Sequence, residues 1–185
     1  MTARRILGWW RRGFAGMARD SRRYWYLVVP VLVIWALAVK RIGFEPTPVS
    51  PLLFNWTPSL PYRVAYADYR ATRFERGDFV LYAFEGPAAA SYPGLAGQPF
   101  FKRIAGVEGG TIEVQDRHVF VNGEYVGWAK PRTFDQRPLD PIDSTAIPAG
   151  YLYVQGTAHD SFDSRYRQSG LVRIETVKAK VTPLL

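Results

Sequence analysis

Two kinds of hydrophobic pattern divide the chain. Residues 24–39 form a single uncharged run, YWYLVVPVLVIWALAV. From residue 76 onward, apolar residues recur in short runs or at alternate positions, and Gly, Pro and Asn separate them. Long apolar runs are typical of membrane helices, whereas alternation with a period of two is typical of strands. The sequence therefore predicts one apolar helix followed by a β-rich domain.

Turn residues divide the β-rich part into short segments. Asn122-Gly123 is typical of a type I′ hairpin turn, and Gly109-Gly110 marks another turn. Segments 88–97 and 130–146 are expected to be loops. Repeated short strands with such turns predict a mainly β fold, an antiparallel barrel or sandwich. Strands are expected at 76–84, 100–105, 111–114, 118–121, 124–126, 151–156 and 172–181.

The apolar run is interpreted as one N-terminal transmembrane helix. Its 16 uncharged residues are slightly short for a bilayer. The predicted anchor therefore extends over 24–44, with Lys40 and Arg41 reaching outward to water. A cleaved signal peptide, ending near Ala36-Leu37-Ala38, is the alternative.

Charge gives the expected orientation. Residues 1–23 contain seven arginines against Asp20, which predicts a cytoplasmic N-terminus and places the domain at 45–185 on the outer side of the membrane. Leu7, Trp10, Phe14 and Met17 recur at helical spacing. Residues 1–23 are therefore either a basic amphipathic helix on the inner leaflet or an unstructured basic tail. Residues 44–61 contain five prolines and are expected to be an extended linker.

Composition excludes several classes of function. The net charge of +8 belongs to the N-terminal end, because residues 42–185 contain 15 basic and 15 acidic residues. This balance argues against a nucleic-acid-binding domain. There is no cysteine, and neither histidine lies in an HExxH motif. No metal site and no cofactor is therefore expected.

Lys102 is the first candidate for chemistry. In a strand over 100–105, Phe100, Lys102 and Ile104 would share one face. Burial between apolar groups lowers the pKa of an amine, so Lys102 could act as a general base near neutral pH. The alternative is an amphipathic strand whose lysine extends to water.

Ser59 is the candidate nucleophile. Pro58 and Pro61 stiffen the backbone around it. Thr57 lies two residues earlier, so both hydroxyls would point to the same side of an extended segment. The Thr57 hydroxyl and the Ser59 N–H could then stabilise an oxyanion. A proline-rich turn with incidental hydroxyls is the alternative.

Three segments in fixed order resemble the serine–lysine signature of type I signal peptidases. They are Ser59-Leu60-Pro61, Phe101-Lys102-Arg103-Ile104-Ala105-Gly106 and Ser161-Phe162-Asp163-Ser164-Arg165-Tyr166. Gly77-Asp78-Phe79-Val80 also resembles the family's strand between the first two boxes. The form N-x-T-P-S-L-P is similar to the conjugative-transfer branch, the TraF-type peptidases.

This resemblance implies a membrane-anchored serine endopeptidase with a signal-peptidase-like β fold. Ser59 and Lys102 would form its catalytic dyad. Ser161 would hydrogen-bond and orient the lysine, and Asp163 and Arg165 would form a supporting salt bridge. A Ser59–His159–Asp163 triad is the less favoured arrangement, since the resemblance makes lysine the base.

The expected partners are a membrane and a protein or peptide substrate, with no nucleic acid. The TraF-type resemblance implies a conjugative pilin, which the enzyme would mature by cleavage or by cyclisation. A general type I signal peptidase is the alternative within the enzyme class. A non-catalytic, membrane-anchored β module of a secretion or conjugation assembly is the alternative outside it.

Overall fold

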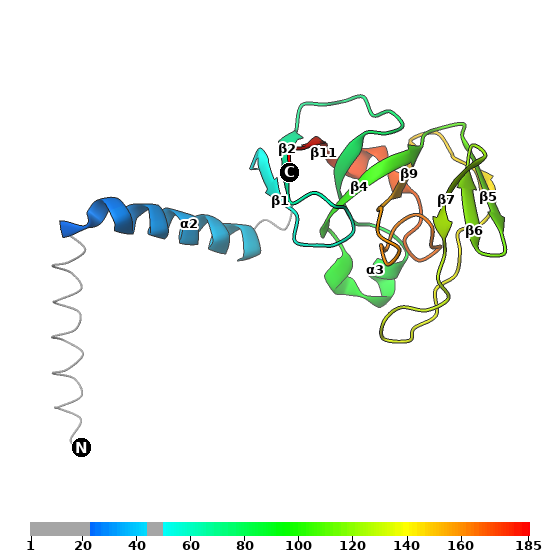
Figure 1. The fold of residues 1–185 in the computed structure, drawn as a ribbon, viewed down its shortest axis with the longest axis horizontal. Helices are drawn as coiled ribbons and strands as arrows, with labels where there is room; N and C mark the ends of the chain where they lie inside the picture. Colours follow the sequence, from blue (N-terminus) through cyan, green and yellow to red (C-terminus); the bar gives the residue numbers. More distant parts are fainter. Residues whose placement is uncertain (1–22, 44–49) are drawn as a thin grey trace, which may run out of the picture. The chain divides into compact units, whose positions relative to one another are not determined.

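The computed structural model describes residues 23–43 and 50–185. The chain divides into two compact units, Met1–Glu45 and Pro46–Leu185 (Figure 1). Residues 1–22, most of the predicted amphipathic segment, lie outside the described residues, as do residues 44–49 of the predicted linker.

The first unit contains the helix α2, Trp25–Gly43, with Pro30 inside it. Apolar side chains such as Leu32, Ile34 and Trp35 are exposed on this helix. In the part of the chain that the structure describes, no helix has both the length and the hydropathy needed to cross a membrane. The predicted helix is therefore present over most of 24–44, whereas the predicted membrane span is not found within the described residues.

The second unit is built on a seven-stranded sheet, in which every pair of neighbouring strands is antiparallel. The strand order is β1-β2-β11-β3-β4-β9-β10. The bounds are β1 Leu52–Phe54, β2 Val64–Asp68, β3 Phe79–Ala83, β4 Pro99–Gly106, β9 Tyr151–Gln155, β10 Val172–Arg173 and β11 Val177–Pro183.

A four-stranded antiparallel sheet, ordered β7-β6-β5-β8, completes the domain. The β6–β7 turn has positive φ at both Asn122 (53°) and Gly123 (75°), as a type I′ turn requires. These two sheets confirm the predicted mainly β, antiparallel fold. The bounds are β5 Thr111–Gln115, β6 His118–Val121, β7 Glu124–Trp128 and β8 Thr145–Ala146.

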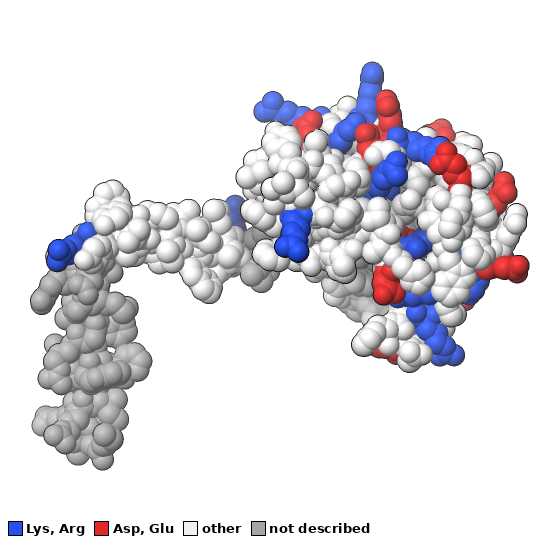
Figure 2. Space-filling model, viewed as in Figure 1, with Lys and Arg blue, Asp and Glu red and all other residues white. Residues whose placement is uncertain are grey.

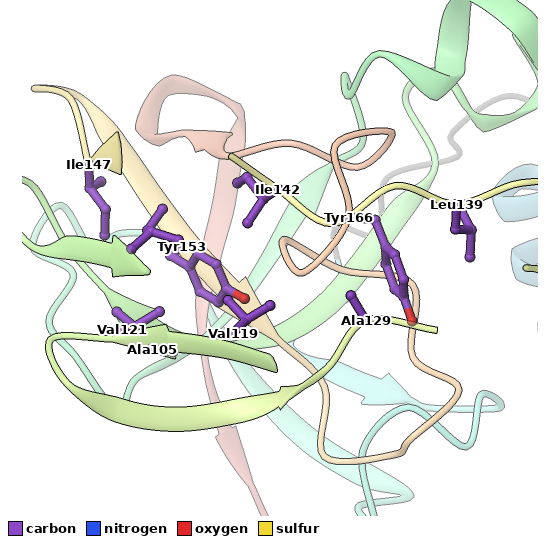
Figure 3. Packing of buried hydrophobic residues seen from close by; sticks show 10 residues of the cluster. Ala105, Val119, Val121, Ala129, Leu139, Ile142, Ile147, Tyr153 and Tyr166 are labelled. Carbon is purple, nitrogen blue, oxygen red and sulfur yellow. The ribbon is translucent and has the colours of Figure 1, made fainter. Parts of the chain in front are cut away.

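Apolar side chains from the strands and from the connecting segments form three buried clusters. Figure 3 shows one of them, in which Val119 and Val121 of β6 pack with Tyr153 of β9. Ala105 of β4 joins the same cluster. A second cluster includes Ile104, the residue before it. Consecutive β4 residues thus face different cores, because side chains alternate across a strand.

Several elements differ from the sequence prediction. The expected loop 88–97 contains the short helix α3, Ala88–Ser91, and the 3₁₀ turn η1, Pro93–Leu95. The expected strand 172–181 is interrupted by a second 3₁₀ turn, η2, Ile174–Thr176. Strands β1, β2 and β8 were not predicted. β1 lies in the proline-rich linker, where pairing with β2 satisfies its backbone despite the nearby prolines.

Gly106 ends β4 at a position with no room for a side chain. A Cβ there would lie 2.5 Å from Ile147 Cδ1 and 2.7 Å from Val121 Cγ1. Both neighbours belong to the buried cluster in Figure 3. The strand pairing of β4 with β9 also shifts register between Ile104 and Gly106.

We expect Gly106→Ala to lower the free energy of unfolding by about 1–3 kcal/mol, because the added methyl group overpacks this cluster. Gly94→Ala is the matched control, since a Cβ there would meet nothing within 4 Å. Urea denaturation measures both variants. Equal stability of the two would contradict the packing described here.

Candidate active site

Lys102 lies in β4, a central strand between β3 and β9. Its side chain is only 4% exposed, and Ile104 on the same face is fully buried. The Phe100 ring centroid lies 5.8 Å from Lys102 Nζ. Arg103, on the opposite face, is exposed. The predicted alternation is therefore confirmed, and the lysine is buried and does not extend to water.

Burial changes the acid–base behaviour of this amine. Desolvation lowers the pKa of Lys102 from its ordinary 10.5 to about 8. The negative charge of Asp163 raises this pKa and the positive charge of Arg165 lowers it, both less than desolvation does. A neutral amine is therefore populated near physiological pH, as a general base requires.

Ser161 makes the direct polar contact with the lysine. Lys102 Nζ donates to Ser161 Oγ over 2.7 Å, and both residues are buried. Ser161 lies in the loop after β9, where its N–H donates to Ala158 O (3.1 Å). Gly156 allows this loop to fold tightly, because a Cβ there would lie 2.2 Å from Ser161 Oγ and 2.6 Å from Ser59 O.

Asp163 and Arg165 form a buried ion pair beside Ser161. Arg165 Nε donates to Asp163 Oδ1 (2.8 Å), and Arg165 Nη2 donates to Asp163 Oδ2 (2.9 Å). The N–H of Gly156 also donates to Asp163 Oδ2 (2.8 Å). Arg165 Nη2 further donates to the carbonyls of Ala158 and Ser161, each at 3.1 Å. The pair therefore fixes the loop that carries Ser161.

Ser59 lies in the connection between β1 and β2. Its carbonyl accepts from Thr157 N (2.9 Å) and Ala158 N (3.3 Å). These bonds attach the Ser59 segment to the loop that carries Ser161. Ser59, Ser161 and Lys102 are thus brought together from three separate parts of the sequence.

The hydroxyl of Ser59 is engaged by Thr57. The two oxygens lie 2.9 Å apart. Thr57 donates its only hydroxyl proton to Asn55 Oδ1 (2.8 Å), so Ser59 is the donor in its contact with Thr57. Within the described residues, no hydrogen bond joins Ser59 Oγ to Lys102 Nζ.

In the described structure, His159 has no hydrogen bond to Ser59 or to Asp163. His159 is exposed, stacks on Trp128 with ring centroids 5.9 Å apart, and lies 3.9 Å from Asp160. The carboxylate of Asp163 is occupied by Arg165 and Gly156. This arrangement argues against the Ser59–His159–Asp163 triad. Among the described residues, no group of three His, Cys, Asp or Glu is placed to hold a metal ion.

Comparison with known proteins identifies the family. A model of the signal peptidase family, peptidase S26, matches residues 22–185. The chain belongs to this family. Its members are serine peptidases, so the chain is assigned to hydrolases that act on protein or peptide substrates.

Individual relatives carry signal peptidase names. The chain is 28% identical over 162 residues to Signal peptidase I V of Bacillus subtilis (strain 168), covering 79% of this chain and 89% of that protein. A crystal structure of a signal peptidase I from Enterococcus faecalis V583 is 24% identical, with a TM-score of 0.39. The match covers 60% of this chain and 97% of the Enterococcus faecalis chain.

A wide groove of about 1390 Å³ is lined in part by Phe100, in the same strand as Lys102. Segments 87–95 and 130–139 contribute most of its lining, together with Phe100 and Phe162. Phe100 connects the groove to the site, because its ring also faces Lys102 Nζ. Ser59, Lys102 and Ser161 are not among the residues that line it.

Two residues of the site were not among those predicted from the sequence. Asn55 hydrogen-bonds Thr57, and Gly156 allows Ser59 and Ser161 to approach. Asn55 had a readable signal, since an asparagine two residues before a threonine is typical of an Asx turn. The need for glycine at 156 depends on a contact with Ser59, which lies 97 positions earlier, and no local pattern reports it.

The lowered pKa of Lys102 gives a stability prediction with a definite sign. Between pH 8 and 10.5 the unfolded chain binds more protons at this lysine than the folded chain, so its effect on stability becomes more favourable as pH rises. We expect Lys102→Met to raise the free energy of unfolding at pH 7 by up to about 3 kcal/mol.

Urea denaturation of Lys102→Met and the unsubstituted protein at pH 7 and pH 10 measures this difference. It should shrink at pH 10, where the amine is largely neutral in the folded protein. A difference that stays constant between the two pH values would show that burial does not lower this pKa.

Proposed function

We propose that this protein is a serine endopeptidase of signal-peptidase type, with Ser59 as nucleophile and Lys102 as general base. The burial of Lys102 carries this proposal, because it gives an amine with a pKa of about 8 close to the serine-bearing segment. Family membership supports the same reaction class.

The reaction would proceed by acyl transfer. Lys102 Nζ takes the Ser59 hydroxyl proton while Ser59 Oγ forms a bond to the substrate carbonyl carbon. The tetrahedral intermediate then loses the amine, which leaves with the proton from Lys102, and an ester to Ser59 remains. Water hydrolyses this ester to a free carboxylate. Attack by the substrate's own N-terminal amine would instead give a cyclic peptide.

Three further groups would support this reaction. In the described structure, the Ser59 N–H has no protein acceptor and could donate to the oxyanion. The Thr57 hydroxyl could donate to the oxyanion only after its hydrogen bond to Asn55 Oδ1 breaks. Ser161 holds the amine, and the Asp163–Arg165 pair fixes Ser161.

The proposed substrate is a conjugative pilin precursor. The sequence form N-x-T-P-S-L-P, which resembles TraF-type peptidases, supports this choice over removal of signal peptides from exported proteins in general. Family membership is equally consistent with a general signal peptidase. The two therefore differ in substrate and share the dyad.

We expect Ser59→Ala and Lys102→Ala each to abolish processing of the pilin precursor, because each removes one member of the dyad. Mass spectrometry of the pilin from cells that express each variant measures this. In the unsubstituted strain, a product lacking one further water would indicate cyclisation, whereas hydrolysis retains that water.

Processing that persists in either variant would contradict the dyad. An unprocessed pilin in the unsubstituted strain, together with cleavage of a small-x-small signal peptide, would favour the general signal peptidase. Unprocessed pilin and uncleaved signal peptide together would favour the non-catalytic β module.

We further propose that residues 24–44 attach the enzyme to the inner membrane in a single pass, with the β domain in the periplasm. The arginines of residues 1–23 support this orientation, and the exposed apolar side chains of α2 support attachment. The β domain is balanced in charge, and Figure 2 shows both signs interspersed on the visible face.

The absence of cysteine allows a direct test of this orientation. Glu108→Cys, in the exposed β4–β5 turn, should react with a membrane-impermeant maleimide in cells whose outer membrane is permeabilised. Thr2→Cys should react only after lysis. Labelling of Thr2→Cys in intact cells, or protection of Glu108→Cys, would contradict the proposed topology.

A further inference from the structure

Asn55 makes four side-chain hydrogen bonds, all within the β1–β2 connection. Its Nδ2 donates to Tyr62 O (2.9 Å) and Leu60 O (3.3 Å). Its Oδ1 accepts from the N–H (3.1 Å) and the hydroxyl (2.8 Å) of Thr57. The donors and acceptors around the amide fix which of its atoms is oxygen, because a flipped amide would oppose like groups.

These bonds close the connection around Ser59. The backbone N–H of Asn55 adds a bond to Arg63 O (2.9 Å), so Asn55 contacts the chain on both sides of the serine. Both amide hydrogens and the carbonyl oxygen are already engaged. Asn55 is therefore suited to hold the loop and not to bind a substrate.

The contact with Thr57 also determines where hydroxyl protons point. The Thr57 hydroxyl donates its hydrogen bond to Asn55 Oδ1, so a lone pair of Thr57 Oγ1 is left to accept from Ser59 Oγ. Ser59 Oγ is therefore held by Thr57, while the Ser59 carbonyl is held by the loop of Ser161. Without Asn55, the Thr57 hydroxyl would be free to rotate, and the position of Ser59 Oγ would no longer be fixed.

We propose that Asn55 is a positioning residue that acts through Thr57 to hold the nucleophile Ser59. This inference rests on the proposed function, in which Ser59 attacks the substrate. Misplacing a reacting atom by about 1 Å can lower the rate 10²-fold, without a comparable effect on substrate binding.

The rate at which the full-length protein processes the pilin precursor, followed by mass spectrometry, tests this role. We expect Asn55→Ala to lower kcat about 10- to 100-fold, because the nucleophile is no longer held, with little change in KM. Asn55→Asp keeps the acceptor for Thr57 but sets its second oxygen against the carbonyls of Leu60 and Tyr62. We therefore expect it to retain more of kcat than Asn55→Ala, with a lowered Tm.

A double-substitution cycle separates positioning from simple loop closure. In the Thr57→Val background, where the hydroxyl is already absent, Asn55→Ala should lower kcat by less than about threefold. An equal loss in both backgrounds would overturn the inference, since loop closure through Leu60 and Tyr62 does not need the Thr57 hydroxyl.

Asn122→Gly is the matched control for stability. Asn122 is the other asparagine of the chain, and its Oδ1 also accepts from a backbone N–H, that of Thr111 (2.8 Å). Its position at a φ of 53° tolerates glycine. We expect a lowered Tm with an unchanged kcat for this variant.

Two outcomes separate the inference from the proposed function. Cleavage that persists in Ser59→Ala would overturn both. An unchanged kcat in Asn55→Ala, beside an inactive Ser59→Ala, would overturn the inference alone.

Discussion

Asp163 and Arg165 place two opposite charges in the interior of the β domain, where neither is stable without the other. Their side chains are 0% and 4% exposed. Removing one partner of such a pair typically costs about 3–5 kcal/mol, because the remaining charge stays buried. The pair binds Gly156 on one side and Ala158 and Ser161 on the other. The loop that holds the lysine contact therefore depends on it.

The same pair explains why burial governs the acid–base properties of Lys102. Asp163 and Arg165 act on the lysine with opposite signs, and desolvation exceeds both. A single unpaired carboxylate at this place would favour the ammonium form and raise the pKa again. Neutralising Asp163 within the ion pair thus keeps the lysine available as a base, while Ser161 still gives it a polar partner.

Local sequence patterns predicted the parts of this structure that depend on neighbouring residues. The alternation around Lys102 predicted its buried face, and Asn122-Gly123 predicted a turn in which both residues have positive φ. The strands β1 and β2 were missed because pairing partners stabilise them: Leu52 pairs with Tyr66, and β11 packs along β2 from the far end of the chain. Likewise, the sequence predicted Ser59 and Lys102 as candidates, but the contacts of each with the 156–161 loop depend on the tertiary structure.

Gly156 shows how little space separates the two halves of the site. The carbonyl of Ser59 and the hydroxyl of Ser161 both lie within 3 Å of the point where a Cβ would stand. The segment that carries Ser59 and the loop that carries Ser161 therefore both pack directly against the backbone of Gly156, which has no side chain. A Cβ at position 156 would displace the Ser59 carbonyl or the Ser161 hydroxyl, and Ser161 Oγ is the group that Lys102 Nζ contacts. A chain can consequently keep both sheets and all three buried clusters and still lose the alignment on which its chemistry depends.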